Sequence, residues 1–201
     1  MQYPKFFDEV DPFILRDDLS CFLGATKDGI IEISYLDCVK LASHSCPTVA
    51  GSYILTKVAL KYLFADEIPK RGEIKVELKD SKDSGVTGVI GTICGFICGA
   101  GDNGGFAGIG GKFSKRDLLT FDNKNIKSMI KFTRVDNNKS INLNLDTSKV
   151  PSDPRMQELM QKAISNKATK DEENEFKRLW QNRVEYMLLN KDKWNEIAIK
   201  I

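Results

Sequence analysis

Hydrophobic and polar residues alternate in several short segments, which predicts strands with one face in water. In "EIKVELK", Ile74, Val76 and Leu78 alternate with charged residues, and "GIIEISYL" predicts a strand that runs into a turn of helix. Further along the chain, "DLLTF", "SMIKFTRV" and "SINLNLD" are also strand-like. The residues Asp136-Asn137-Asn138 between the last two predict a hairpin turn.

Proline and capping residues mark where helices are expected to begin, because proline suits the first helical turn and short polar side chains accept from its free amides. The first helix is expected from Pro12 to about Phe22, and the second from Pro47 to the break at "IPKRG". Two more are expected near the end of the chain, at Asp153-Pro154 and at a capping box over residues 169–172. The last helix carries apolar residues along one side, namely Phe176, Leu179, Trp180, Val184, Met187 and Leu188.

Residues 84–101 form a run without a charged residue. Its β-branched residues recur every three or four positions and its glycines occupy a second face, at Gly88, Gly91, Gly95 and Gly99. This pattern predicts a buried helix pressed against a neighbouring backbone. A buried strand is the alternative, because valine and isoleucine favour strands. Six glycines and two threonines dilute the apolar character, so we do not expect a membrane span.

The length of 201 residues suits one domain with an appendage. The sequence changes from strand-like to helical after Val150, so we expect an α+β domain over residues 1–150 and a C-terminal helical extension over residues 151–201. Such a helical pair covers the sheet of its own chain or reaches a second protomer. The amount of apolar surface favours a homodimer, in which Trp180, Met187 and Leu188 would be buried against the partner.

Composition narrows the class of partner. Lysine and arginine (30) nearly balance aspartate and glutamate (28), which gives no reason to expect nucleic acid and favours a small-molecule ligand or a protein. Five cysteines are an odd number scattered through the chain, which fits a reducing compartment better than a disulfide framework. The segment "MQYPKFFDEVDPF" resembles no signal or transit peptide. We therefore expect a soluble, cytoplasmic protein.

The segment "ASHSCPTVAGSYILTK" contains the strongest candidate site. His44 is the only histidine, and Cys46 directly precedes the proline that is expected to begin a helix. Amide donors and the helix dipole favour a thiolate at such a position. Imidazole and thiolate together suit a borderline metal such as zinc, and the same pair could instead act as base and nucleophile. A purely structural role for both residues is the third possibility.

A metal site needs further ligands, and carboxylates, water, Cys94 or Cys98 are the available sources. Cys98 is the better of the two cysteines because it lies at the expected helix end beside a glycine-rich turn, although cysteines in a buried helix more often serve only packing. The run "GAGDNGGFAGIGG" contains a formal G-x-G-x-x-G. Because a helix precedes it and the strand-like segment around Phe106 follows, it does not fit a dinucleotide-binding loop.

The stretches "LDCVKLASHSCPTVAGSYILTKVAL" and "GVTGVIGTICGFICGAGDNGGF" resemble the FmdE family, which takes its name from formylmethanofuran dehydrogenase. The resemblance covers roughly residues 20 to 125. It implies a two-layer α+β fold of helix, strand, helix and three further strands. It also implies a metal site at His44 and Cys46, with Cys98 placed across a less certain gap. Members typically have a second histidine and a glycine where this chain has Ala42 and Thr48, and some carry a zinc ribbon that this chain lacks.

From these observations we expect a cytoplasmic metal-binding protein of the FmdE type, with zinc as the metal. It would serve molybdenum, tungsten or other metal-enzyme systems through a reaction that the sequence does not specify. One alternative is a metal-free thiol enzyme in which Cys46 is the nucleophile. The other is a non-catalytic, dimeric interaction or assembly module.

Overall fold

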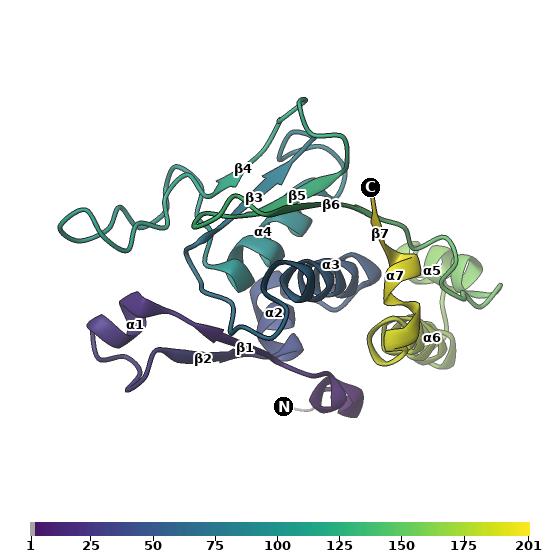
Figure 1. Cartoon of the computed structure of the whole chain (residues 1–201). Coiled ribbons are helices and arrows are strands. Elements are labelled where there is room, and N and C mark those ends of the chain that lie inside the picture. The colour runs from purple at the N-terminus through teal and green to yellow at the C-terminus, as the bar shows by residue number, and fades with distance from the viewer. Residues whose placement is uncertain (1–2) are drawn as a thin grey trace.

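The computed structural model describes residues 3–201, which form two sheets with helices packed against them (Figure 1). The helices are the 3-10 helix η1 (Lys5–Glu9), α1 (Asp18–Phe22), α2 (Tyr35–Ala42), α3 (Pro47–Phe64), α4 (Thr87–Cys98), α5 (Met156–Ile164), α6 (Lys170–Leu189), the 3-10 helix η2 (Lys191–Lys193) and α7 (Trp194–Ile197). The strands are β1 (Phe13–Arg16), β2 (Ile30–Ile33), β3 (Ile74–Leu78), β4 (Leu119–Thr120), β5 (Ile130–Arg134), β6 (Ser140–Leu145) and β7 (Ala198–Lys200). This mixture confirms the predicted α+β class.

A five-stranded sheet in the order β4-β3-β5-β6-β7 forms one layer, and α3 and α4 pack against it as the second (Figure 1). Strands β3, β5, β6 and β7 are antiparallel neighbours, whereas the short β4 runs parallel to β3. In β3 the apolar side chains Ile74, Val76 and Leu78 are fully buried, as their alternation predicts. The predicted hairpin joins β5 to β6, with Thr133 paired to Ser140.

Helix α3 is the central element of the core, and it contacts α4, β6 and α6. The consecutive residues Tyr53, Ile54 and Leu55 are all fully buried, so the helix is covered on several sides. Its start is as predicted, with Cys46 as the N-cap and Pro47 as the first helical residue. The position of this helix matters for function, because the candidate site lies at its N-terminus.

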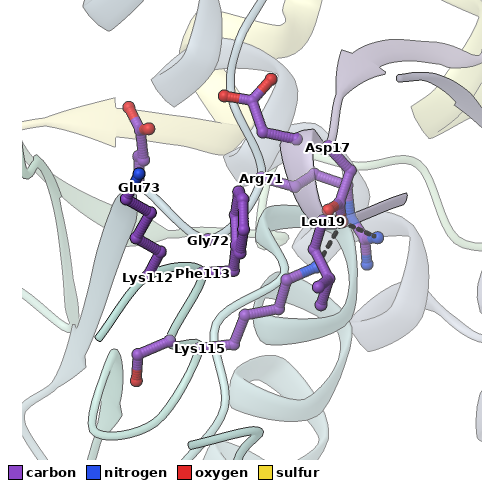
Figure 2. Close-up of a pocket in the computed structure, with 10 residues that line it drawn as sticks. Asp17, Leu19, Arg71, Gly72, Glu73, Lys112, Phe113 and Lys115 are labelled. Carbon is purple, nitrogen blue, oxygen red and sulfur yellow. Dashed lines mark hydrogen bonds and ion pairs between the residues drawn. The ribbon is translucent and has the colours of Figure 1, made fainter. Parts of the chain in front are cut away.

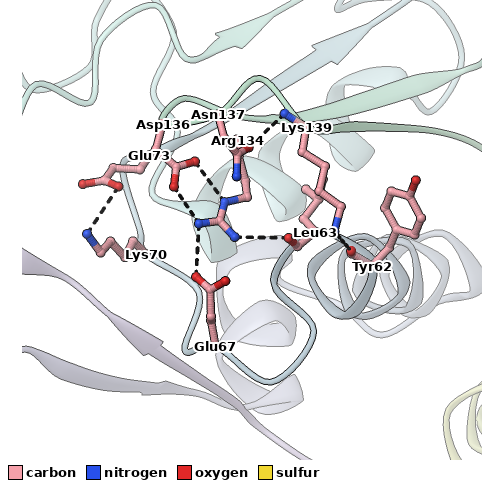
Figure 3. A network of polar contacts seen from close by, with 9 residues as sticks. All are labelled: Tyr62, Leu63, Glu67, Lys70, Glu73, Arg134, Asp136, Asn137 and Lys139. Atoms are coloured by element: carbon pink, nitrogen blue, oxygen red, sulfur yellow. Dashed lines mark hydrogen bonds and ion pairs between the residues drawn. The ribbon is translucent and has the colours of Figure 1, made fainter.

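Two cations from the β5–β6 hairpin bind the C-terminal end of α3 (Figure 3). Arg134 donates to the Leu63 carbonyl at 3.2 Å. Lys139 donates to the same carbonyl at 3.3 Å and to that of Tyr62 at 2.7 Å. The last carbonyls of a helix have no partner within the helix and lie at the negative end of its dipole, so both cations stabilise this end. Asp136 holds the Arg134 guanidinium in place at 2.6 Å.

The uncharged, glycine-rich segment forms helix α4, which confirms the helical interpretation over the strand. A Cβ atom built on Gly95 would lie only 2.8 Å from the Ala100 carbonyl oxygen, so a neighbouring backbone does press against this helix. Gly99, with φ 64°, is the left-handed C-cap, and the formal G-x-G-x-x-G therefore follows a helix C-terminus. Neither α4 nor any other helix in residues 3–201 combines the length and apolar character that crossing a membrane requires.

Two of the predicted elements are wrong. Pro12 does not begin a helix, because the residues after it form β1, which pairs antiparallel with β2 and alternates between buried and exposed side chains. Pairing with another strand overrides the local proline signal, and only the short α1 is helical here. The strand-like segment after Phe106 is a loop that carries an isolated bridge between Ile109 and Lys112.

Of the C-terminal residues, expected as a helical extension from residue 151, the second half of α6 and the residues after it join the main core, whereas α5 and the first half of α6 form a small second cluster. Helices α5 and α6 contact each other, and α6 packs on α3. Met187 and Leu188 are fully buried, so the apolar side of α6 contacts its own chain. The capping box of α6 is confirmed, α5 begins two residues later than expected, and β7 adds an unpredicted edge strand beside β6.

Candidate functional site

The segment between α2 and α3 contains the predicted site. Ser43 ends α2 in the left-handed conformation with φ 64°, and the chain then extends to Cys46. The His44 side chain is exposed, and its Nδ1 lies 2.8 Å from the Ala42 carbonyl oxygen. Because only a protonated nitrogen can donate to this carbonyl, the neutral ring carries its proton on Nδ1. The Nε2 lone pair therefore stays available for a metal ion or a proton.

Cys46 places its thiol at the N-terminus of the 18-residue helix α3. Its Sγ accepts a hydrogen bond from the Val49 amide at 3.5 Å, and the residue is partly exposed. One short extended segment thus presents an imidazole and a thiol two residues apart.

Helix α6 anchors this segment from far along the chain. Trp180 Nε1 and Gln181 Nε2 both donate to the Ser45 carbonyl oxygen, at 3.0 and 3.3 Å. The Tyr35 hydroxyl lies 3.0 Å from the Ser45 hydroxyl, and burial raises the pKa of Tyr35, which keeps it a neutral hydrogen-bonding group. Sequence reasoning assigned Trp180 to an interface and missed this role. The signal was present, since a partly buried indole N–H needs an acceptor.

Cys94 and Cys98 are fully buried residues of α4. The Thr56 hydroxyl donates to Cys94 Sγ at 3.4 Å, and the Cys94 thiol lies 3.7 Å from the Ser52 carbonyl oxygen. Burial raises the pKa of Cys94 to about 12 and holds that of Cys98 well above its usual value. Both therefore remain thiols at neutral pH when no metal is bound. Their surroundings are those of packing residues.

Within residues 3–201, no group of three or more His, Cys, Asp or Glu side chains lies close enough together to hold a metal ion. Cys98, predicted as a third ligand, therefore forms no such cluster with His44 and Cys46. Catalytic zinc sites usually have three protein ligands and structural sites four. One chain therefore supplies an imidazole and a thiol, the two donor types that suit a borderline metal, but not the three or four protein ligands of a complete zinc site.

The surface beside His44 is hollowed along α4. Ala42, whose carbonyl binds His44, lines a cavity of about 370 Å³ together with Lys82, Val89 and Thr92. This volume lies within the range of about 300–1,000 Å³ that is usual for small-molecule sites. Lys82 is paired with Asp102 at 3.4 Å, so a ligand there would depend mainly on the apolar wall, next to the segment that carries the imidazole and the thiol.

Another cavity, of about 310 Å³, is built around Asp17 (Figure 2). Asp17 has 2% exposed surface and pairs with Arg71 at 3.0 Å and with Lys115. Burial alone would raise the pKa of this carboxyl, but the Lys115 ammonium, the Ser20 amide and the Arg71 guanidinium together hold it below its usual value. The same guanidinium donates to two carbonyls at the C-terminal end of α4, at 3.1 and 2.7 Å. Asp17, Arg71 and Lys115 are thus paired with groups of the chain itself, so we interpret this cavity as a structural junction.

A family model matches most of the chain. Its description is "FmdE, Molybdenum formylmethanofuran dehydrogenase operon", and it matches residues 42–194 of 201. No curated protein and no solved structure matches the chain. The match contains both the His44–Cys46 segment and the helix α6 that anchors it, whereas Tyr35 lies before its first residue. The chain therefore belongs to the FmdE family.

Proposed function

We propose that this protein binds a transition metal, with zinc the most suitable, through His44 and Cys46. One observation carries the proposal: the hydrogen bond from His44 Nδ1 to the Ala42 carbonyl leaves Nε2 of the neutral ring open to a ligand, two residues from a thiol that caps α3. Imidazole and thiolate are preferred ligands of zinc. With two protein ligands the remaining positions are open to water, to a small molecule in the cavity beside Ala42, or to a partner protein.

Family membership supports a role for this chain in a formylmethanofuran dehydrogenase system, which the family description names. We infer that it serves a molybdenum, tungsten or other metal enzyme. A metal at this site would supply Lewis acidity toward a bound carbonyl or water. The chain's own contribution is to fix the imidazole tautomer through Ala42 and to hold the segment through Trp180. Five free cysteines support a reducing, cytoplasmic location.

Metal analysis of the purified chain, equilibrated with Zn²⁺ and freed of unbound ions, tests the proposal. We expect close to one zinc per chain, lost in His44→Ala and in Cys46→Ser because each removes one of two protein ligands. Cys21→Ser is the matched control, since Cys21 is an exposed thiol outside the segment. Cys98→Ala retains the metal if its thiol serves only packing. Metal-free wild-type protein, or unchanged loading in both site variants, would contradict the proposal.

The alternative function is that of a metal-free thiol enzyme, with Cys46 as nucleophile and His44 as base. The contact from the Val49 amide and the partial exposure of the thiol favour it. Alkylation by iodoacetamide at neutral pH, followed by peptide mass spectrometry, distinguishes this alternative. Cys46 should react faster than the exposed Cys21 without added metal, and His44→Ala should slow it. Equal rates for the two cysteines would remove this alternative.

The third candidate function is a dimeric interaction or assembly module. The residues from which a homodimer was predicted are used inside the chain, since Trp180 binds Ser45 and the apolar side of α6 is buried. We therefore propose a different surface, where Leu41 and Phe106 are 44% and 43% exposed and line one shallow hollow. Sedimentation should give a dimer that Phe106→Glu dissociates. A single species at 22.6 kDa would remove the homodimer.

A further inference from the structure

A cavity of about 810 Å³ lies between the second half of α3, strand β6 and the C-terminal elements η2, α7 and β7. We call it the lysine cavity, because Lys57, Lys61, Lys191 and Lys200 line it, together with Trp194. Its volume is in the upper part of the range of about 300–1,000 Å³ that is usual for small-molecule sites. The metal proposal makes no use of these residues.

The lysine cavity is strongly positive. Asp11 is the carboxylate that lines it, so four lysines give a formal excess of three positive charges. Asp11 is already paired with Lys191, and Lys61 pairs with the exposed Asp66 at 3.2 Å. Within residues 3–201, neither Lys57 nor Lys200 forms a salt bridge, and Asp11 acts on Lys57 only at longer range. Clustered ammonium groups that lack counter-ions attract an anion.

Lys57 and Lys200 contact aromatic rings instead. Lys57 Nζ donates to the Pro12 carbonyl at 2.8 Å and lies 4.2 Å from the centre of the Phe13 ring. Lys200 Nζ lies 4.0 Å from the centre of the Tyr62 ring. These cation–π contacts hold both ammonium groups in place at the wall of the cavity.

The half-buried Lys57 gains most from a bound anion. Burial is the main reason that the pKa of Lys57 is lowered to about 8; the Asp11 carboxylate opposes this shift and the Lys191 ammonium adds to it. Lys61, one turn further along α3, and Lys200 on β7 add positive charge on other sides of the cavity. Lysines that are largely buried are usually paired with a carboxylate, and Lys57 has no such salt bridge. An anion in the cavity would restore the charged state that burial disfavours.

The cavity also has an aromatic wall. Trp194 Nε1 donates to the Met187 carbonyl at 3.0 Å, so the indole N–H is satisfied within the chain and the ring remains for contact with a ligand. Tyr62, also in the lining, is 40% exposed. Flat apolar groups pack well against such rings. We propose that the lysine cavity binds a small organic dianion with an aromatic body, whose carboxylate or phosphate groups contact Lys57 and Lys200.

This site is separate from the proposed metal site. Cys46 caps the N-terminus of α3, and Lys57 lies eleven residues further along the helix, which corresponds to about 16 Å at a rise of about 1.5 Å per residue. The two proposals therefore stand or fall separately. Loss of metal in Cys46→Ser should leave binding in the lysine cavity unchanged.

Isothermal titration calorimetry of the full chain with isophthalate and with phenyl phosphate tests the proposal. The two probes separate a carboxylate ligand from a phosphate ligand. We expect at least one of them to bind with a Kd of about 1 mM or tighter. Three compounds serve as control ligands: benzamide lacks the negative charge, and succinate and inorganic phosphate lack the aromatic ring. We expect all three to bind about tenfold more weakly or worse, because each loses one of the two kinds of contact.

Variants assign the binding to this cavity. Lys57→Met and Lys200→Met should each weaken the bound probe by about tenfold, because each removes a charge-assisted contact. Lys193→Met is the matched control, since it removes the same charge from the neighbouring η2 but pairs with Glu196 at 3.1 Å outside the cavity lining. The control should bind as the wild type does.

A measurement on the wild-type chain covers the case in which Lys57→Met does not fold. Near pH 8, where Lys57 is partly neutral, binding should take up protons, and the bound probe should protect Lys57 from acetylation more than Lys193. The proposal is overturned if neither aryl dianion binds, if benzamide binds equally well, or if both lysine variants bind as the wild type does. An oligonucleotide that displaces the probe and binds more tightly would assign the cavity to nucleic acid and also overturn it.

Discussion

The buried carboxylate of Asp17 ties three segments together, because it caps α1 and also pairs with Arg71 before β3 and with Lys115 in the loop after α4. We expect Asp17→Asn to lower the free energy of unfolding by about 3 kcal/mol, since it leaves two partly buried cations without their counter-ion. Urea denaturation measures this loss. Asp18→Asn is the control, because Asp18 is only partly buried and its pair with the exposed Arg16 is worth at most about 1 kcal/mol.

The same carboxylate predicts how stability depends on pH. The pKa of Asp17 is lowered in the folded protein, so the unfolded chain binds this proton more readily than the folded one. Its stabilising effect is complete above the unfolded value of about 4 and is lost as pH falls through the lower folded value. Between about pH 5 and pH 3, Asp17→Asn should therefore lose less stability than the wild type. Parallel pH profiles for the two proteins would contradict this.

Gly95 is a second residue whose identity is fixed by its surroundings. A Cβ there would lie 2.8 Å from the Ala100 carbonyl oxygen and 3.0 Å from Leu119. Alanine would gain about 1 kcal/mol of helix propensity but would overpack this contact at a cost of about 1–3 kcal/mol. We expect Gly95→Ala to lower the melting temperature. Thr92→Ala, on the exposed side of α4, is the control and should raise the melting temperature slightly. A higher melting temperature in both variants would show that the backbone around Gly95 relaxes to accept the added methyl group.

At the scale of elements, α6 controls the order of the candidate site. Trp180 Nε1 donates to the Ser45 carbonyl between His44 and Cys46. Trp180→Phe keeps the aromatic packing and removes this donor, so the segment should open more often. We expect faster hydrogen exchange at Cys46–Val49 and faster alkylation of Cys46. Trp194→Phe is the control, because this tryptophan lies far along the chain from the segment, and both rates should stay as in the wild type. Unchanged exchange in Trp180→Phe would refute the anchoring role.

Elements with a strong local signal were predictable. Pro47 after a capping cysteine, the alternation in β3 and the capping box of α6 each lie within a few residues, and the structure confirms all three. The helix predicted at Pro12 was wrong because β1 depends on pairing with β2, which the local sequence does not reveal. The strand-like segment after Phe106 was wrong for a related reason. Gly108, Gly110 and Gly111 all have positive φ, which breaks a strand.

At the candidate site, too, local features were predictable from the sequence and long-range contacts were not. His44 and Cys46 were found from the sequence because they lie on one short segment, and the Nδ1 contact with Ala42 is local as well. The Trp180 anchor lies 135 positions away in the sequence and could not be inferred from spacing. The lysine cavity was missed for the same reason, since its lysines come from three separate elements.

The whole molecule depends on its C-terminal quarter, which the sequence presented as an extension. Strand β7 completes the five-stranded sheet, and α6 packs on the central helix α3 (Figure 1). The family match likewise spans residue 150, from 42 to 194. The C-terminal residues also form part of both proposed sites, through Trp180 at one and Trp194 at the other.

Removal of residues 151–201 should therefore leave a chain that does not fold. Val184, Met187 and Leu188 are fully buried in the main core, and burial of each such side chain contributes about 2 kcal/mol. Their sum, about 6 kcal/mol, is comparable with the whole stability of a typical domain, about 5–15 kcal/mol. Circular dichroism and sedimentation should show an unfolded or aggregated fragment, whereas removal of Ile201 alone, which is 56% exposed, should be tolerated. A folded, monomeric fragment that still binds zinc would mean that residues 151–201 form a separable arm.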